Sequence, residues 1–175
     1  MSAVQDGLPT PPHLASEFYV WLWWASETRE AKFSLGEQGD IELWVDERLA
    51  FRLPSDTKIS AVMTGENPST SLESRAALVG GKVLQDVRVR FRRDDREFSV
   101  TLKGPEMHIQ RAKFPQNVDG GGEEALYDRM FLYEELCFVI ATLFQEFATL
   151  RTTGAWADEV LPAMQAWSQG APSGD

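Results

Sequence analysis

Apolar residues recur at helical spacing over residues 123–150, a long stretch without Gly or Pro. Their positions alternate in steps of four and three: Leu126, Met130, Tyr133, Cys137, Ile140, Phe144 and Phe147. This spacing predicts one apolar stripe along a long helix. A second apolar row lies beside it, at Leu132, Leu136, Val139, Leu143 and Leu150. We expect this helix to form the spine of the core, or to turn its excess apolar arc toward another subunit.

A second helical pattern covers residues 13–28 and is apolar on two sides. One face holds Leu14, Phe18, Trp21, Leu22 and Ala25, and the other pairs Tyr19 with Trp23 and Val20 with Trp24. A helix of this kind is either sandwiched between layers or in contact with a partner. On the second interpretation, Tyr19, Trp23 and Trp24 are the candidate anchors of a subunit interface.

Alternation with a period of two predicts two antiparallel meanders. The first covers residues 33–53, with turns at GEQGD and at DER, and a short strand follows at 58–64. The second covers residues 87–110, and a helix capped by Thr70 separates the two. A final helix is expected over 156–167, with a kink at Pro162. The fold class is therefore α+β: two antiparallel β-meanders, each preceded by a helix, packed against a long C-terminal helix and a final short helix.

Length and composition predict a single α+β domain over residues 12–168, with flexible tails at 1–11 and 169–175. The first residues lack the basic and apolar regions of a signal peptide. The longest apolar runs are far shorter than the roughly 20 residues that span a bilayer. The single cysteine, Cys137, excludes an intrachain disulfide and suits a reducing compartment. We therefore expect a cytoplasmic protein without a membrane partner.

The formal net charge of −10 argues against a nucleic-acid partner when it is taken alone. The charge is unevenly distributed, however. Residues 82–113 hold nine Lys/Arg and five Asp/Glu, a net of +4, whereas the rest holds 8 Lys/Arg and 22 Asp/Glu, a net of −14. An acidic protein with one basic segment is more informative than the total charge.

Motifs that would carry catalysis are missing from the sequence. His13 and His108 are the two histidines, and each is expected on the surface. There is no His/Cys spacing typical of zinc and no Gly-x-Ser-x-Gly elbow. We therefore expect a protein that is not an enzyme, with no catalytic residues, no metal site and no cofactor.

The basic segment predicts one candidate binding surface. Alternation places Arg88, Arg90 and Arg92 on one face of a strand. The remaining candidates are expected on the same kind of face or in the nearby turn: Arg48, Arg52, Lys103, Arg93 and Arg96. Such a face would neutralise phosphates without reading base sequence. The alternatives are a solvated face whose arginines pair with neighbouring carboxylates, and a docking site for an acidic protein.

Two stretches resemble recombination-associated RdgC proteins. Residues 13–27, HLASEFYVWLWWASE, are similar to the family pattern [FL]-x-x-EF-x-x-WLW-x-x-SE. The matching positions are Leu14, Glu17, Phe18, Trp21, Leu22, Trp23, Ser26 and Glu27. Residues 128–150, followed by Ala155-Trp156 and by the EVLPA of 159–163, resemble the closing helices of the family.

The resemblance implies a nucleoid-associated homodimer that binds duplex DNA without sequence preference and restrains recombination. It implies neither a cofactor nor catalysis. Two other hypotheses remain open from the residues themselves. One is a protein-interaction or assembly module that docks through its helices. The other is a small-ligand pocket between the sheet and the long helix, lined by Phe and Trp.

Overall fold

The computed structural model describes residues 14–56, 58–64, 72–115 and 122–170, with only the backbone at positions 46 and 47. The helices are α1 (Leu14–Thr28), α2 (Leu72–Val79), α3 (Glu123–Arg151) and α4 (Leu161–Ser168), with a 3-10 turn η1 (Gly36–Gln38) and a π-helical turn η3 (Trp156–Val160). The strands are β1 (Lys32–Ser34), β2 (Asp40–Arg52), β3 (Ile59–Thr64), β4 (Val83–Arg93), β5 (Arg96–Lys103) and β6 (His108–Lys113). The predicted tail 1–11 and the predicted cap Thr70 lie outside these ranges.

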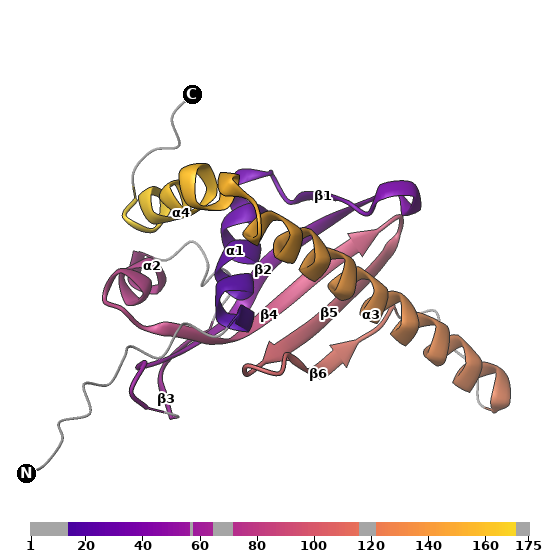
Figure 1. Cartoon of the computed structure of the whole chain (residues 1–175). Coiled ribbons are helices and arrows are strands. Elements are labelled where there is room, and N and C mark those ends of the chain that lie inside the picture. Colours follow the sequence, from indigo (N-terminus) through magenta and orange to yellow (C-terminus); the bar gives the residue numbers. More distant parts are fainter. Residues whose placement is uncertain (1–13, 57, 65–71, 116–121, 171–175) are drawn as a thin grey trace, which may run out of the picture.

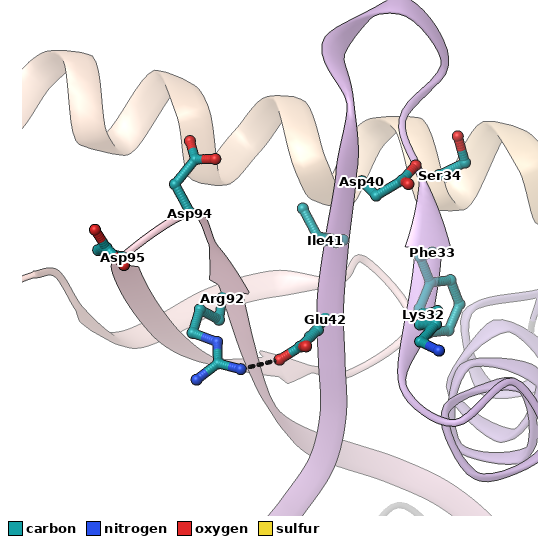
Figure 2. A pocket seen from close by; sticks show the side chains of 9 residues that line it. All are labelled: Lys32, Phe33, Ser34, Asp40, Ile41, Glu42, Arg92, Asp94 and Asp95. Atoms are coloured by element: carbon teal, nitrogen blue, oxygen red, sulfur yellow. Dashed lines mark hydrogen bonds and ion pairs between the residues drawn. The ribbon is translucent and has the colours of Figure 1, made fainter.

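The described strands form one six-stranded sheet in the order β1-β2-β4-β5-β6, with β3 pairing to the second half of β2. Every described pair is antiparallel, so the two predicted meanders join through β2 and β4. Glu42 of β2 lies opposite Arg92 of β4, and the two side chains form an ion pair (Figure 2). The predicted α+β class, with antiparallel meanders and a long helix near the C-terminus, is confirmed.

The prediction of a turn at DER, residues 46–48, is wrong. The strand β2 continues through these residues and bulges instead: Val45 pairs with Val89 and Leu49 with Val87, so three residues stand opposite Arg88 alone. Val45 and Leu49 are both buried. The bulge therefore keeps both apolar side chains in the core without ending the strand.

Helices cover one face of the sheet, and α3 crosses it diagonally (Figure 1). The helix α1 lies between the sheet and the other helices, with contacts to β2, β4, α3 and α4. Its Phe18 packs against two rings of α3, at centroid distances of 5.2 Å to Phe144 and 5.5 Å to Phe147. The sandwiched interpretation of the first helix is therefore confirmed.

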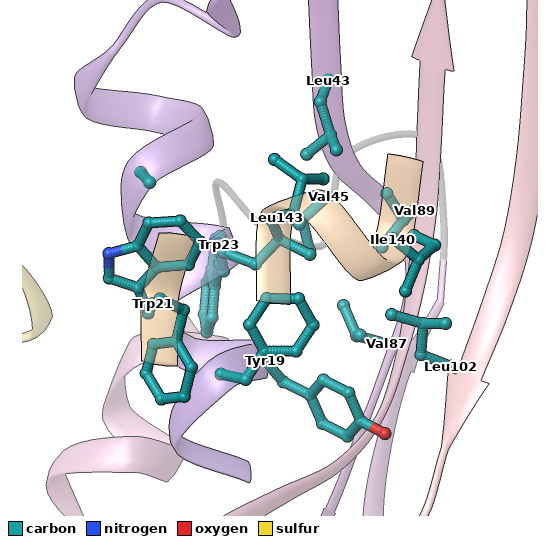
Figure 3. Close-up of a cluster of buried hydrophobic side chains, with 14 of the residues drawn as sticks. Tyr19, Trp21, Trp23, Leu43, Val45, Val87, Val89, Leu102, Ile140 and Leu143 are labelled. Carbon is teal, nitrogen blue, oxygen red and sulfur yellow. The ribbon is translucent and has the colours of Figure 1, made fainter. Parts of the chain in front are cut away.

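The aromatic residues of α1 belong to the core (Figure 3). Tyr19 is 1% exposed and Trp23 is 0% exposed, while Trp24 is half-buried and packs against the same core. The prediction that they anchor a subunit interface is wrong for Tyr19 and Trp23, because the protein's own sheet and helices already cover them. Of the rings that could line a pocket beside the long helix, Phe18, Phe144 and Phe147 pack against one another between α1 and α3.

A polar contact fixes the last helix. Glu27 of α1 accepts hydrogen bonds from the indole N–H groups of Trp23, at 2.8 Å, and of Trp167 in α4, at 2.7 Å. It also pairs with Arg75 of α2 at 2.6 Å. One carboxylate thus connects α1, α2 and α4 at the edge of the core. Among the described residues, no helix is both long enough and apolar enough to cross a membrane.

The two halves of α3 have different environments. In its second half Val139, Leu143 and Phe147 are buried against the sheet and α1. In its first half Leu126 and Met130 are exposed, although they belong to the stripe that was predicted to face the core. The spine role is therefore confirmed for the second half only.

Candidate anion-binding groove

A groove of about 490 Å³ crosses the sheet on the face opposite the helices. Val87 and Val89 of β4 point into the core, so Arg88 between them points into this groove. The lining comes from five strands: Arg48 of β2, Thr64 of β3, Arg88 of β4, Thr101 of β5, and Arg111, Ala112 and Lys113 of β6. Four of these seven side chains are cationic and none is acidic.

Arg88 is the fixed centre of the groove. Its side chain donates hydrogen bonds to Ser99 Oγ at 2.7 Å and to Thr101 Oγ1 at 3.4 Å. The residue is only 7% exposed, and both hydroxyls belong to the neighbouring strand β5. The guanidinium is therefore held in place before any ligand arrives, which lowers the entropic cost of binding.

A bulge in β6 brings Arg111 to the groove. Thr101 pairs with Gln110 and Ser99 pairs with Lys113, so two residues of β6 stand opposite Val100. Arg111 has a backbone φ of 51°, in the left-handed region that a residue with a side chain rarely adopts. Bulges of this type redirect a side chain. In β6 the bulge brings the Arg111 side chain to the groove, which Lys113 also lines.

Arg48 lies at the other end of the groove, opposite Thr64, and is the last of the three bulged residues of β2. Its charge acts on Asp86, which is 2% exposed. Burial raises the pKa of the Asp86 carboxyl above its ordinary value, an effect that Lys103 and Arg48 oppose. One oxygen, Oδ1, has no hydrogen-bond partner among the described residues.

Three of the four groove cations differ in their partners from most other arginines that the structure describes. Within the described part of the chain, no carboxylate lies within ion-pair distance of Arg48, Arg111 or Lys113. Guanidinium and ammonium groups in this situation favour an anionic ligand, and the fork of arginine matches the oxygens of a phosphate.

Arg90 and Arg92 lie on the same face of β4 but nearer its end. Arg90 is 3.7 Å from Glu97, and Arg92 pairs with Glu42. Both guanidinium groups also stack on the Trp44 ring, at 5.0 and 5.8 Å from its centroid. The expected alternative, a face whose arginines pair with neighbouring carboxylates, therefore describes this end of β4.

Arg93 and Arg96 have a different function from the predicted one. Arg96 donates two hydrogen bonds to the Glu135 carboxylate of α3, at 2.6 and 2.8 Å. Arg93 donates to Glu135 at 3.2 Å and to the carbonyl of Gln38 at 2.6 Å. These arginines attach α3 to the β4–β5 turn, so we remove them from the candidate site.

Arg52 and Lys103 also lie outside the groove lining. Arg52 is 9% exposed, and its side chain donates to Gln85 at 2.8 Å and to three backbone carbonyls between residues 53 and 56. It is therefore a structural residue, which corrects its expected role as a phosphate contact. Lys103 is exposed on β5, opposite Asp86.

The sequence pattern identified Arg48 and Arg88 but missed Arg111 and Lys113. Both lie in the basic segment 82–113, but the alternation does not assign them to the binding face. Regular alternation after Met107 and Ile109 would place Arg111 and Lys113 on the apolar face, and only the bulge places them in the groove. Two cations at positions where the alternation predicts apolar residues are the feature of the sequence that indicates a bulge.

A larger hollow, of about 700 Å³, lies where β1, β2 and the β4–β5 turn meet (Figure 2). Four carboxylates line it, from Asp40, Glu42, Asp94 and Asp95, against two cations. This charge disfavours an anion. Among the described residues, no cluster of His, Cys, Asp or Glu has the arrangement of a metal site. The larger volume of this hollow therefore does not make it a better candidate than the groove for binding an anion.

Comparisons of this chain with models of protein families, with curated proteins and with solved structures give no match.

Proposed function

We propose that this protein binds the phosphate backbone of duplex DNA without reading sequence and without catalysis. The observation that carries the proposal is the groove itself. Four cationic side chains from three strands line it, and none of the lining residues that the structure describes is acidic. The resemblance of residues 13–27 to RdgC proteins supports the same class of ligand, and a role in recombination within the nucleoid follows from that resemblance alone.

The chemistry of the groove suits a backbone more than a base. Arg88 is held by Ser99 and Thr101, and Arg48, Arg111 and Lys113 surround it. Contacts of Arg and Lys with phosphate oxygens position a protein on a duplex but carry no sequence information. Among its described lining residues there is also no aromatic ring on which an unpaired base would stack.

The net charge of −10 limits the affinity. The carboxylates elsewhere on the protein repel a polyanion, so the attraction acts only where the groove faces the duplex. We expect dissociation constants in the range of nonspecific binding, about 10⁻⁴ to 10⁻⁶ M. Each neutralised phosphate releases counterions, so the binding constant must fall steeply with salt.

The test is fluorescence anisotropy with a short labelled duplex of mixed sequence, in about 50 mM and about 200 mM NaCl. The variant Arg111→Ala/Lys113→Ala should bind more weakly. The slope of log K against log salt should also decrease by up to about 2, because each lost phosphate contact contributes about 0.9.

The charge-matched control is Arg92→Ala/Arg151→Ala, which removes two cations that pair with Glu42 and Glu17 outside the groove. It should retain the wild-type slope. Absence of binding at the lower salt concentration would refute the proposal. Equal losses in the two double variants would show that total charge, and not the groove, governs binding.

The second candidate function, an assembly module, is favoured by a separate observation: exposed apolar side chains on the first half of α3.

A further inference from the structure

The first half of α3 exposes a row of large apolar side chains. Leu126 is 58% exposed, Met130 is 52% and Tyr133 is 47%. Tyr127 and Phe131 flank the row and are 59% and 68% exposed. Figure 1 shows this end of the helix extending beyond the sheet. Single exposed apolar residues are normal on a protein surface, but a contiguous row is typical of an interaction site.

The row has the spacing of a two-stranded helix seam. Leu126, Met130, Tyr133 and Cys137 follow steps of four, three and four, which are the d and a positions of a heptad. A repeat of 3.5 residues drifts around a helix of 3.6 residues per turn by about 20° per heptad. Beyond this small drift, the environment changes along the helix: the sheet and α1 cover the continuation of the row, through Ile140 to Phe147, whereas Leu126, Met130 and Tyr133 remain outside.

The charges beside the row favour a parallel second copy. With Met130 at position a, Arg129 occupies position g and Glu134 occupies position e. In a parallel pair, a g residue meets the e residue five positions further along the partner. Arg129 of each copy would then face Glu134 of the other. In an antiparallel pair, g faces g and e faces e, so Arg129 and Glu134 lie on opposite sides of the seam and cannot pair.

The size of the surface suits a weakly associating second copy. An aromatic side chain carries about 150–250 Å² of surface, so Leu126, Met130, Tyr133 and the position-e residue Tyr127 expose roughly 450 Å². Each partner of a standard interface contributes about 800 Å². The second half of α3 is already packed, and Glu135 is fixed by Arg93 and Arg96. Pairing therefore adds no cost of helix nucleation.

We propose that the first half of α3 pairs in parallel with the same segment of a second copy, through Leu126, Met130, Tyr133 and Cys137. Ion pairs between Arg129 and Glu134 of the opposite copies flank this seam. The interface is distinct from the Trp-rich helix, which is buried within each subunit. The inference does not depend on nucleic-acid binding, because the groove lies on the other face of the sheet.

The mass of the protein in solution tests the association. Light scattering of the DNA-free protein, from micromolar to millimolar concentration, should show the mass rise from monomer to dimer. Met130→Glu places two like charges in the seam and should keep the protein monomeric. The matched control Leu161→Glu changes an exposed apolar residue of α4 and should leave the dimer intact. Circular dichroism should show that both variants stay folded.

Cys137 reports the direction of the pair. Equivalent a positions meet across a parallel seam, and a disulfide needs Cα atoms about 4.4–6.8 Å apart. In an antiparallel pair centred on the exposed row, the two cysteines would lie about 15 Å apart along the axis at 1.5 Å per residue. Mild oxidation should therefore give a covalent dimer in the wild type, and none in Cys137→Ser or Met130→Glu.

A charge swap completes the test. Arg129→Glu should weaken the dimer, and Arg129→Glu/Glu134→Arg should restore it. A monomer at all concentrations would overturn the proposal, as would a dimer that Met130→Glu leaves unchanged. A dimer without the Cys137 disulfide would overturn the parallel arrangement. None of these outcomes bears on duplex binding, which is measured separately.

Discussion

Arg88 and Arg92 lie four residues apart on the same face of β4, yet their surroundings differ. Arg88 is buried, is held by Ser99 and Thr101, and lines a groove in which none of the described lining residues is acidic. Arg92 is exposed, pairs with Glu42 and stacks on Trp44. The neighbouring strands set these contacts: Ser99 and Thr101 of β5 lie beside Arg88, and Glu42 of β2 lies opposite Arg92.

The same contrast separates two groups of cations. At the β4–β5 turn, Arg93 and Arg96 attach α3 to the sheet through Glu135. Across the middle of the sheet, the bulges of β2 and β6 bring Arg48, Arg111 and Lys113 to one groove, and no carboxylate of the described residues pairs with these three. The cations of the sheet thus divide into a structural group and a group suited to a ligand.

Removal of the Glu135 carboxylate should have the largest effect on stability. Glu135→Ala leaves two guanidinium groups without their shared partner, and the Glu135 side chain is only 13% exposed. We expect a loss of about 2–3 kcal/mol in the free energy of unfolding, less than for a fully buried pair because Arg96 is partly exposed. Chemical denaturation measures it, with the exposed Glu37→Ala as the control. Equal stability of the two variants would contradict the structural role of this cluster.

Replacement of Arg88 should affect both stability and binding. Arg88→Ala leaves two buried hydroxyls without their donor, which we expect to cost about 1–2 kcal/mol, and it should also weaken duplex binding. Arg92→Ala, its counterpart on the same strand face, should stay within about 0.5 kcal/mol and retain binding. Denaturation and anisotropy on both variants test the contrast. Equal effects would contradict the different roles assigned to Arg88 and Arg92.

The smallest effect is expected at Asp86. Burial raises the pKa of this carboxyl above its ordinary 3.8, so the folded protein holds the proton to higher pH than the unfolded chain does. The stability that the protonated carboxyl contributes is therefore complete below the ordinary pKa of 3.8, and it is lost as pH rises through the raised pKa of the folded protein. Asp86→Asn avoids this loss, so its stability relative to the wild type should increase from about pH 4 to about pH 7.

The same variant also tests whether the charge of Asp86 affects duplex binding. Asp86→Asn removes a negative charge that acts on Arg48 and Lys103, so duplex binding should strengthen a few-fold at low salt. Denaturation at several pH values and anisotropy at two salt concentrations are the measurements. A stability difference that shrinks with rising pH would contradict the raised pKa. Unchanged binding would show that Asp86 does not influence the groove.

Much of the fold could be predicted from local patterns. The helical period of residues 123–150 and the alternation around Val87 and Val89 both correspond to elements of the structure. The turn expected at residues 46–48 could not be recognised as a bulge, because a polar triplet between two apolar alternations is compatible with either. For the groove, the pattern supplied Arg48 and Arg88, while the bulge at Arg111 depends on pairing between β5 and β6.

The sequence alone determined the class of the fold, the lengths of its helices and the concentration of positive charge in residues 82–113, because these depend on local spacing and composition. Tertiary structure alone decided which arginines meet a carboxylate and which half of the long apolar stripe is covered. Those outcomes depend on strand register and on where the sheet ends beneath α3. Both are set by contacts between residues far apart in the chain.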